Sequence, residues 1–70
     1  MSGVQPTPWR WLLLDEHGHG VDTSEGFESR GDAETWIGEA HPALVEDGID
    51  AAQLVRDDDT VGAPLSLTRR

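Results

Sequence analysis

The run Trp9–Leu14 is the feature that most constrains the fold, because it is apolar on both faces of the strand that it predicts. Successive side chains of a strand alternate between its faces. One face therefore carries Trp9, Trp11 and Leu13, and the other carries Arg10, Leu12 and Leu14. Only one later stretch has the pattern of an amphipathic helix, and a single helix covers only one face of a sheet. The second face is therefore a candidate contact surface.

The chain has 70 residues and no cysteine, which excludes disulfides, thiolate zinc sites and cysteine nucleophiles together. At this size one core rarely supplies more than ~3–5 kcal/mol, and association with a second copy is a common remedy. No apolar run approaches the ~18 residues that a membrane span needs, and no secretory signal pattern precedes the fold. We expect a flexible N-terminal tail at residues 1–8 and a single cytoplasmic domain at residues 9–70.

Residues 29–48 carry the pattern of one helix with its caps. Ser29 precedes Asp32 by three residues, the spacing at which a hydroxyl accepts an amide hydrogen of the first helical turn. An apolar stripe follows at helical spacing: Ala33, Trp36, Ile37, Ala40 and Leu44. Pro42 removes one helical hydrogen bond, so we expect a kink or a short second segment there. Gly48 predicts a left-handed cap, sealed by Ile49.

Strands are predicted on both sides of this helix. After a glycine-rich turn, residues 21–28 predict a second strand with Val21 and Phe27 on one face. Residues 51–56 predict a third strand. Residues 60–67 predict a fourth with one face formed by Val61, Ala63, Leu65 and Leu67, and Pro64 favours an edge strand or a bulge. The prediction is an α+β fold in which a small antiparallel sheet packs on one helix, in the order β-β-α-β with a further strand at the end.

Several short motifs of the central stretch occur together in one order. They are Trp9-Arg10-Trp11, Gly18-His19-Gly20, Thr23-Ser24-Glu25-Gly26-Phe27, Ser29-Arg30, Ala33-Glu34 and Ile37. In this order they resemble the small YegP-like domain family over about residues 9–40. The resemblance implies a β-sheet plus one helix, in units that pair into a single sheet and exchange C-terminal strands. It implies no catalytic residues.

Charge in this chain is strongly unbalanced. Fourteen Asp and Glu residues stand against five arginines, and the net charge is −9. Nucleic-acid binding requires clustered Lys and Arg, and the only adjacent basic pair is Arg69-Arg70, so nucleic acid is not an expected partner. A solvated surface of halophilic type is the favoured interpretation of the acidity, and an acidic mimic of nucleic acid is the alternative.

Catalytic motifs are absent from the sequence. It has no GxSxG, no HExxH, no phosphate-binding glycine loop and no lysine. Asp22, Ser24, Ser29 and the histidines include the residue types of a catalytic triad. We do not expect a triad, because Ser29 is already explained as the cap of the predicted helix. So small a domain is also expected to lack the ~300 Å³ cleft of a typical small-molecule site. We expect no enzymatic activity and no cofactor.

One short segment is rich in metal-binding residue types. Asp15, Glu16, His17 and His19 lie within five residues, and imidazole with carboxylate suits zinc, nickel or copper. The glycines around the histidines predict a turn, whereas a structural zinc site needs four preorganised ligands. Two solvated turn histidines are the favoured interpretation, which leaves His17 and His19 as the weakest candidate site.

Together these patterns favour a small acidic, non-enzymatic protein that acts as a homodimeric protein-interaction module joined through its sheet. Its candidate interface residues are Trp9, Trp11, Leu12, Leu14 and Leu54. The segment after Gly48 is where strands would be exchanged. Two alternatives stay open: an acidic regulator that docks on a basic protein, and a binder of a small ligand or metal. An apolar contact predicts weak salt sensitivity, whereas acidic docking predicts binding that salt abolishes.

Overall fold

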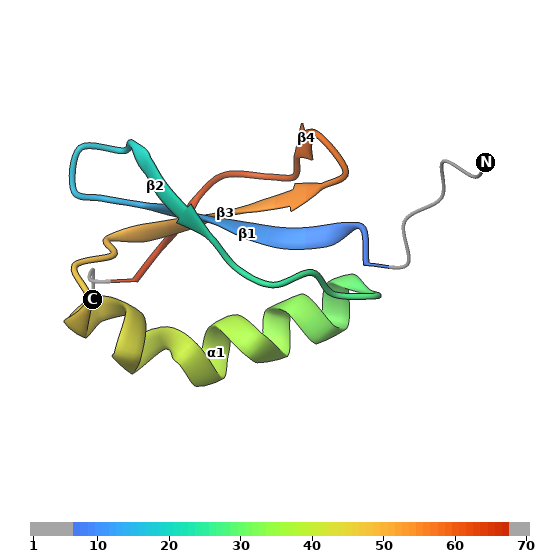
Figure 1. Ribbon diagram of the computed structural model, residues 1–70, viewed down its shortest axis with the longest axis horizontal. Helices are drawn as coiled ribbons and strands as arrows, with labels where there is room; N and C mark the ends of the chain where they lie inside the picture. Colours follow the sequence, from blue (N-terminus) through green and yellow to red (C-terminus); the bar gives the residue numbers. More distant parts are fainter. Residues whose placement is uncertain (1–6, 68–70) are drawn as a thin grey trace.

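The computed structural model describes residues 7–67 and confirms the α+β prediction. The elements are β1 (Trp9–Leu14), β2 (Gly20–Thr23), α1 (Arg30–Glu46), β3 (Ala51–Arg56), β4 (Asp59–Thr60) and β5 (Leu65–Ser66). All strands pair antiparallel in one sheet of order β2-β1-β3-β4, and β5 also pairs with β3. The helix α1 lies along one face of this sheet (Figure 1). Within residues 7–67, no helix is both long enough and apolar enough to cross a membrane.

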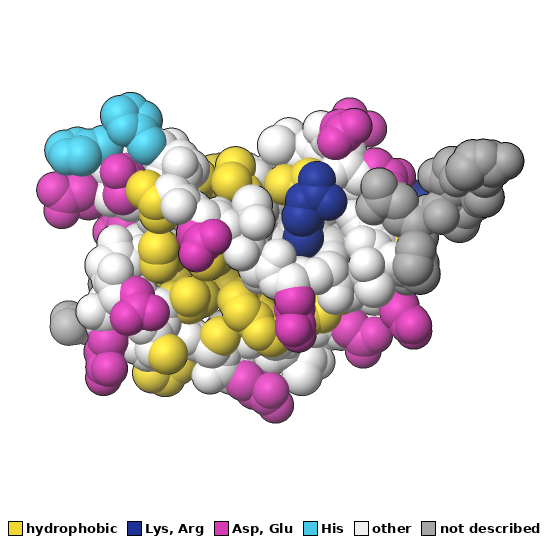
Figure 2. Space-filling view, in the orientation of Figure 1, with side chains coloured by type: hydrophobic (Ala, Val, Ile, Leu, Met, Phe, Trp, Pro, Cys, Tyr) yellow, Lys and Arg dark blue, Asp and Glu magenta, His cyan; other side chains and the backbone are white. Residues whose placement is uncertain are grey.

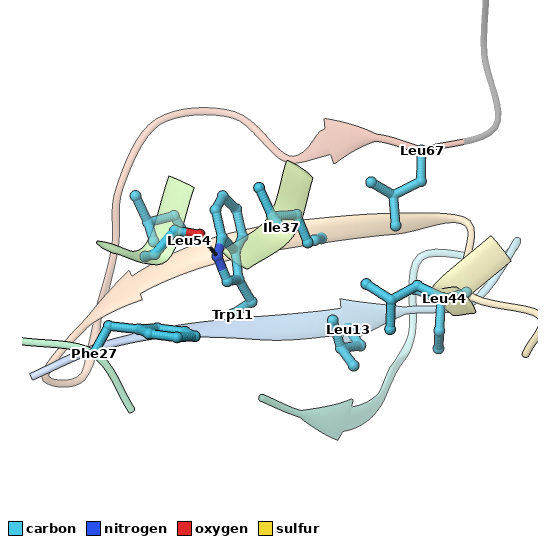
Figure 3. Close-up of a cluster of buried hydrophobic side chains, with 10 residues drawn as sticks. Trp11, Leu13, Phe27, Ile37, Leu44, Leu54 and Leu67 are labelled. Carbon is cyan, nitrogen blue, oxygen red and sulfur yellow. Dashed lines mark hydrogen bonds between the residues drawn. The ribbon is translucent and has the colours of Figure 1, made fainter. Parts of the chain in front are cut away.

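The core fills the space between α1 and the sheet. Figure 3 shows the side chains of β1, β3 and the helix converging there. The buried cluster consists of Trp11, Leu13, Phe27, Ala33, Ile37, Leu44, Ile49, Ala52, Leu54 and Leu67. The indole Nε1 of Trp11 donates a hydrogen bond of 2.8 Å to the carbonyl oxygen of Ala33. This bond satisfies a buried N–H group and joins the central strand to the first turns of the helix.

The predicted helix caps are both confirmed. The Ser29 hydroxyl accepts the Asp32 amide hydrogen at 3.1 Å. At the other end Gly48 has a φ of +90°, a conformation that glycine adopts without strain. The Gly48 and Ile49 amides donate to the carbonyls of residues 45 and 44 at 3.1 and 3.0 Å, which is a Schellman motif. Ile49 is buried and seals this end.

The prediction of a separate segment after Pro42 is wrong, because α1 continues through it to Glu46. Proline removes one hydrogen bond and crowds the carbonyl four residues earlier. That carbonyl belongs to Gly38, which is exposed and has open space where a side chain would be. Burial of Ile37 and Leu44 holds the turns before and after the proline on the sheet.

The predicted shared face of Val21 and Phe27 is also wrong. Val21 is 54% exposed, whereas Phe27 is 8% exposed. Two irregularities separate them. The register shifts between Leu13 and Leu14, where Val21 is the extra residue between the paired Gly20 and Asp22. Beyond β2, the Ser24 hydroxyl accepts the Trp11 amide hydrogen at 2.9 Å. Further along, Phe27 and Trp9 exchange backbone bonds of 2.7 and 3.2 Å. Between these contacts the chain advances three residues, from Ser24 to Phe27, while β1 spans only two, from Trp11 to Trp9. The extra residue shifts the alternation of side chains, as it does at a β-bulge.

The strand predicted at residues 60–67 is interrupted. β4 and β5 pair only with β3, and Pro64 lies in the gap between them, which confirms an edge strand with a break. Gly62, with a φ of +70°, begins this gap. The prediction of one apolar face fails here, because Leu65 is 46% exposed while Leu67 is 4% exposed. A break in pairing resets which side chains face the core.

The N-terminal tail prediction falls mostly outside the described residues, since residues 1–6 are not among them. Thr7 and Pro8 are half-buried. The Pro8 carbonyl accepts the Asp57 amide hydrogen at 2.8 Å.

Candidate functional site

The face of the sheet opposite α1 carries no carboxylate at the positions that strand pairing assigns to it. Residues directly opposite each other on neighbouring strands share a face. The registers therefore define an open face that consists of Arg10, Leu12, Leu14, Gly20, Thr23, Ala51, Gln53, Val55, Thr60 and Ser66. The chain has 14 acidic residues, and each of them lies elsewhere. The carboxylate of Asp58 lies beside this face, 3.9 Å from the Arg10 guanidinium.

The five predicted interface residues have different environments. Trp11 and Leu54 are 5% and 4% exposed, oppose each other on β1 and β3, and pack against the helix. Leu14 lies on the open face but is 8% exposed. Trp9 is half-buried and packs against the core. Leu12, half-buried near the centre of the open face, is therefore the member best placed to contact a partner.

Each arginine in residues 7–67 has a partner within the fold. Arg10 donates to the Asp57 carbonyl at 3.0 Å and lies 3.9 Å from the Asp58 carboxylate. Arg30 bonds to Glu34 at 3.0 Å, one helical turn away. The Arg56 guanidinium lies 5.5 Å from the centre of the Trp9 ring.

Carboxylates outnumber these cations over most of the surface. All 14 acidic residues fall within the described range, against three arginines. Figure 2 shows carboxylates around much of the face in view, with hydrophobic side chains between them. Apart from the open face, this surface attracts cations and repels anions.

A groove runs between α1 and the edge of the sheet, and its volume is about 370 Å³. Its lining, which we call the edge groove, consists of Trp11, Arg30, Glu34, Ile37, Leu54, Val61, Gly62, Ala63 and Leu65. The expectation that the domain lacks a cleft of ~300 Å³ is therefore wrong. That expectation rested on the small size of the domain, whereas the break between β4 and β5 forms one wall of a groove.

Gln53 holds this wall in place. It is 7% exposed, and its amide nitrogen donates to the carbonyls of Val61 and Gly62 at 3.2 and 3.1 Å. Buried amides are stable only when they are hydrogen-bonded, so these contacts fix the loop as well as the side chain. Sequence reasoning missed this residue. The available signal was a single polar side chain within the otherwise apolar run Ala51–Val55.

The turn between β1 and β2 is organised by Asp15. Its Oδ1 atom accepts amide hydrogens from His19 and His17 at 2.9 and 2.8 Å. The bond from the His19 amide is the main reason that the pKa of Asp15 is lowered. The Asp15 carboxylate therefore stabilises the turn through two backbone amides.

The candidate metal ligands His17 and His19 lie on this exposed turn. Their ring centres are 6.2 Å apart, and His17 Nε2 lies 3.4 Å from a Glu16 carboxylate oxygen. Figure 2 shows the histidine side chains projecting from the end of the molecule where this turn lies. Among residues 7–67, no three His, Cys, Asp or Glu side chains come together as a metal site would require.

The residues considered for a catalytic triad are bonded to backbone groups instead of to one another. Ser24 accepts the Trp11 amide hydrogen, and Ser29 caps the helix. The Asp22 carboxylate accepts the Thr23 amide hydrogen at 2.8 Å. His41 Nε2 bonds to the Leu67 carbonyl, which joins the helix to the last described strand.

Comparisons of the chain with protein-family models, with curated proteins and with solved structures found no match.

Proposed function

We propose that this protein is a non-enzymatic protein-interaction module that acts as a homodimer, with two copies packed through their open faces. The observation that carries the proposal is the absence of carboxylates from that face in a chain of net charge −9. Like-charge repulsion opposes the association of two such chains. Contact through the open face would bring together surfaces that have no carboxylate at their paired positions.

The composition of the open face also suits this contact. Leu14, Gln53 and Val55 are already buried within one chain, so the accessible groups are the half-buried Leu12 and the exposed, neutral Thr23 and Thr60. Two sheets that pack face to face lie ~10 Å apart with their inner side chains interdigitated. A second sheet would thus cover Leu12 and the exposed residues around it, and it would add apolar burial to a core of limited size.

The non-enzymatic part of the proposal draws support from the partners of the candidate catalytic groups. Ser24, Ser29, Asp22 and His41 all engage backbone atoms. A catalytic base has to be within hydrogen-bond reach of its nucleophile. Here the hydrogen bonds instead stabilise local structure.

The YegP-like resemblance adds a further element to this proposal. It implies that the strands after Gly48 are exchanged between paired units. Gly48 lies between α1 and β3, at the point where such an exchange would open the chain. In an exchanged dimer β3 would pair with β1 of the other copy, in the register seen within one chain.

Sedimentation equilibrium tests the homodimer. We expect a mass of twice 7.6 kDa at micromolar concentration. Leu12→Asp introduces a carboxylate at the centre of the open face and should yield a monomer. Ala43→Asp adds the same charge at an exposed position of α1 and should remain dimeric. Circular dichroism establishes that each variant is folded.

Thr23→Asp provides a second test on the same face, because Thr23 is exposed and opposes Leu12. It removes no apolar side chain from the chain. A wild-type mass of 7.6 kDa that does not rise with concentration contradicts the proposal. Dissociation by Ala43→Asp to the same extent as by the open-face variants also contradicts it.

A further inference from the structure

We propose that the edge groove binds a basic peptide segment, which inserts one large apolar side chain between α1 and the broken edge strand. This site is separate from the open face and goes beyond the proposed homodimer. Its occupant is a segment of a basic protein in which an aliphatic or aromatic residue is flanked by Arg or Lys.

The floor of the groove is apolar and reaches the core. Trp11, Ile37 and Leu54 form part of the buried cluster and also line the groove. Leu65, at the rim, is 46% exposed and is one of the most exposed large hydrophobic residues of the described chain. An apolar side chain that entered here would cover Leu65 and contact the three floor residues. Such burial is what anchors peptide segments in hydrophobic grooves.

The walls of the groove are preformed. On the sheet side, the Gln53 amide holds the carbonyls of Val61 and Gly62. On the helix side, Arg30 and Glu34 are joined through a bond of 3.0 Å. A groove with fixed walls loses little conformational entropy on binding, which favours affinity. Its volume of about 370 Å³ is small for an extended ligand but sufficient for a large side chain.

The charge around the groove selects a cationic occupant. Glu34 lies on the helix wall, and the acidic turn Asp57–Asp59 leads through β4 into Val61 on the opposite wall. Within the lining, the charges of Arg30 and Glu34 offset each other. The excess of negative charge beside the groove therefore comes from the turn Asp57–Asp59, which Thr60 joins to Val61. Arg or Lys residues next to the apolar anchor would meet these carboxylates.

Alternative occupants fit these features less well. A second copy of the chain carries a net charge of −9 and would bring its own carboxylates toward the acidic turn beside the groove. A small anionic ligand meets the same repulsion. An uncharged apolar molecule matches the floor but makes no use of the acidic turn.

Fluorescence polarisation tests the proposal with labelled synthetic peptides of nine residues. The probe has one leucine flanked on each side by two arginines. In the first control peptide serine replaces leucine, and in the second glycines replace the arginines. We expect the probe to bind at least about tenfold more tightly than either control. We also expect its affinity to fall between 50 and 300 mM NaCl, since screening weakens the charged contacts.

Two protein variants with the same change of charge locate the binding site. Ala63→Arg places a long cationic side chain in the groove, whereas Ala43→Arg places it on exposed helix surface outside the lining. We expect Ala63→Arg to weaken probe binding about tenfold or more, and Ala43→Arg to weaken it less than about twofold. Both variants should remain homodimers by sedimentation, because neither position belongs to the open face.

The alternatives give different results in the same experiment. Equal effects of the two variants would show diffuse attraction to the acidic surface and overturn the proposal. If the glycine-flanked peptide bound as tightly as the probe, the groove would accept an uncharged apolar ligand. If the serine peptide bound as tightly as the probe, no apolar side chain would be needed for binding. Either result overturns the proposal. Loss of the dimer in Ala63→Arg alone would assign the groove to a second copy. A failure of peptide binding with an intact, Leu12-dependent dimer would reject this inference and leave the homodimer proposal standing.

Discussion

Replacement of Trp11 by phenylalanine tests the link between the sheet and the helix. Trp11 is 5% exposed, and its indole donates 2.8 Å to the Ala33 carbonyl in the core. Phenylalanine keeps an aromatic ring but cannot donate this bond. It also leaves part of the indole volume empty. We therefore expect Trp11→Phe to destabilise the fold by two additive mechanisms.

The size of the effect follows from these two losses. A buried hydrogen bond contributes about 1 kcal/mol net, and a partly filled space in the core costs about 1 kcal/mol more. The expected loss is therefore about 2 kcal/mol, a large share of the ~3–5 kcal/mol that a core of this size supplies. With an unfolding entropy of ~2.1 cal/mol/K per residue, this corresponds to a fall of about 10–15 °C in Tm.

Urea denaturation followed by far-ultraviolet circular dichroism measures this change in the free energy of unfolding. All samples are compared at one protomer concentration, because association contributes to apparent stability. Trp36→Phe is the matched control. Trp36 is half-buried, with its ring 5.7 Å from that of Phe27, and we expect its replacement to cost at most about 1 kcal/mol. An equal loss in the two variants would refute the role assigned to the Trp11–Ala33 bond.

Three further predictions concern single residues. Gly38→Ala should stabilise the protein by about 0.5–1 kcal/mol, because alanine favours a helix interior and its Cβ meets open space. Gly26→Ala should destabilise the protein by about 1–3 kcal/mol, because its Cβ would lie 2.5 Å from the Thr7 hydroxyl. Both are measured by urea denaturation, and a common sign for the two would contradict the packing described. For Asp15, the lowered pKa means that its contribution is fully present above about pH 4 and is lost as the pH falls through the folded pKa. Wild type should thus be more stable than Asp15→Asn at pH 7, with a difference that shrinks as the pH falls below about 4. A difference independent of pH would contradict this role.

The local features of the fold could be predicted from the sequence because each depends on a few neighbouring residues. Ser29 caps the helix through an amide three residues away, and Gly48 ends it through its own φ angle. The apolar stripe of α1 was equally readable, since helical periodicity alone places Ile37 and Leu44 on one face.

The features that could not be predicted depend on contacts between distant segments. Ser24 shifts the phase of its strand through a bond to Trp11, 13 residues earlier. The edge groove depends on the Gln53 amide, which holds a loop eight and nine residues further along the chain. Neither bond leaves a periodic pattern in the sequence, so alternation could not predict the shift in the second strand, and domain size alone predicted no groove.

Thiol cross-linking tests the central proposal, contact of two open faces, most directly. The chain has no cysteine, so Leu12→Cys introduces a single reactive group at the centre of that face. A bifunctional maleimide with a reach of ~10 Å, the spacing of packed sheets, should link two Leu12→Cys chains efficiently at micromolar concentration. Ala43→Cys, on the exposed surface of α1, should remain unlinked under the same conditions. Efficient cross-linking of Ala43→Cys with none of Leu12→Cys would contradict the proposed homodimer.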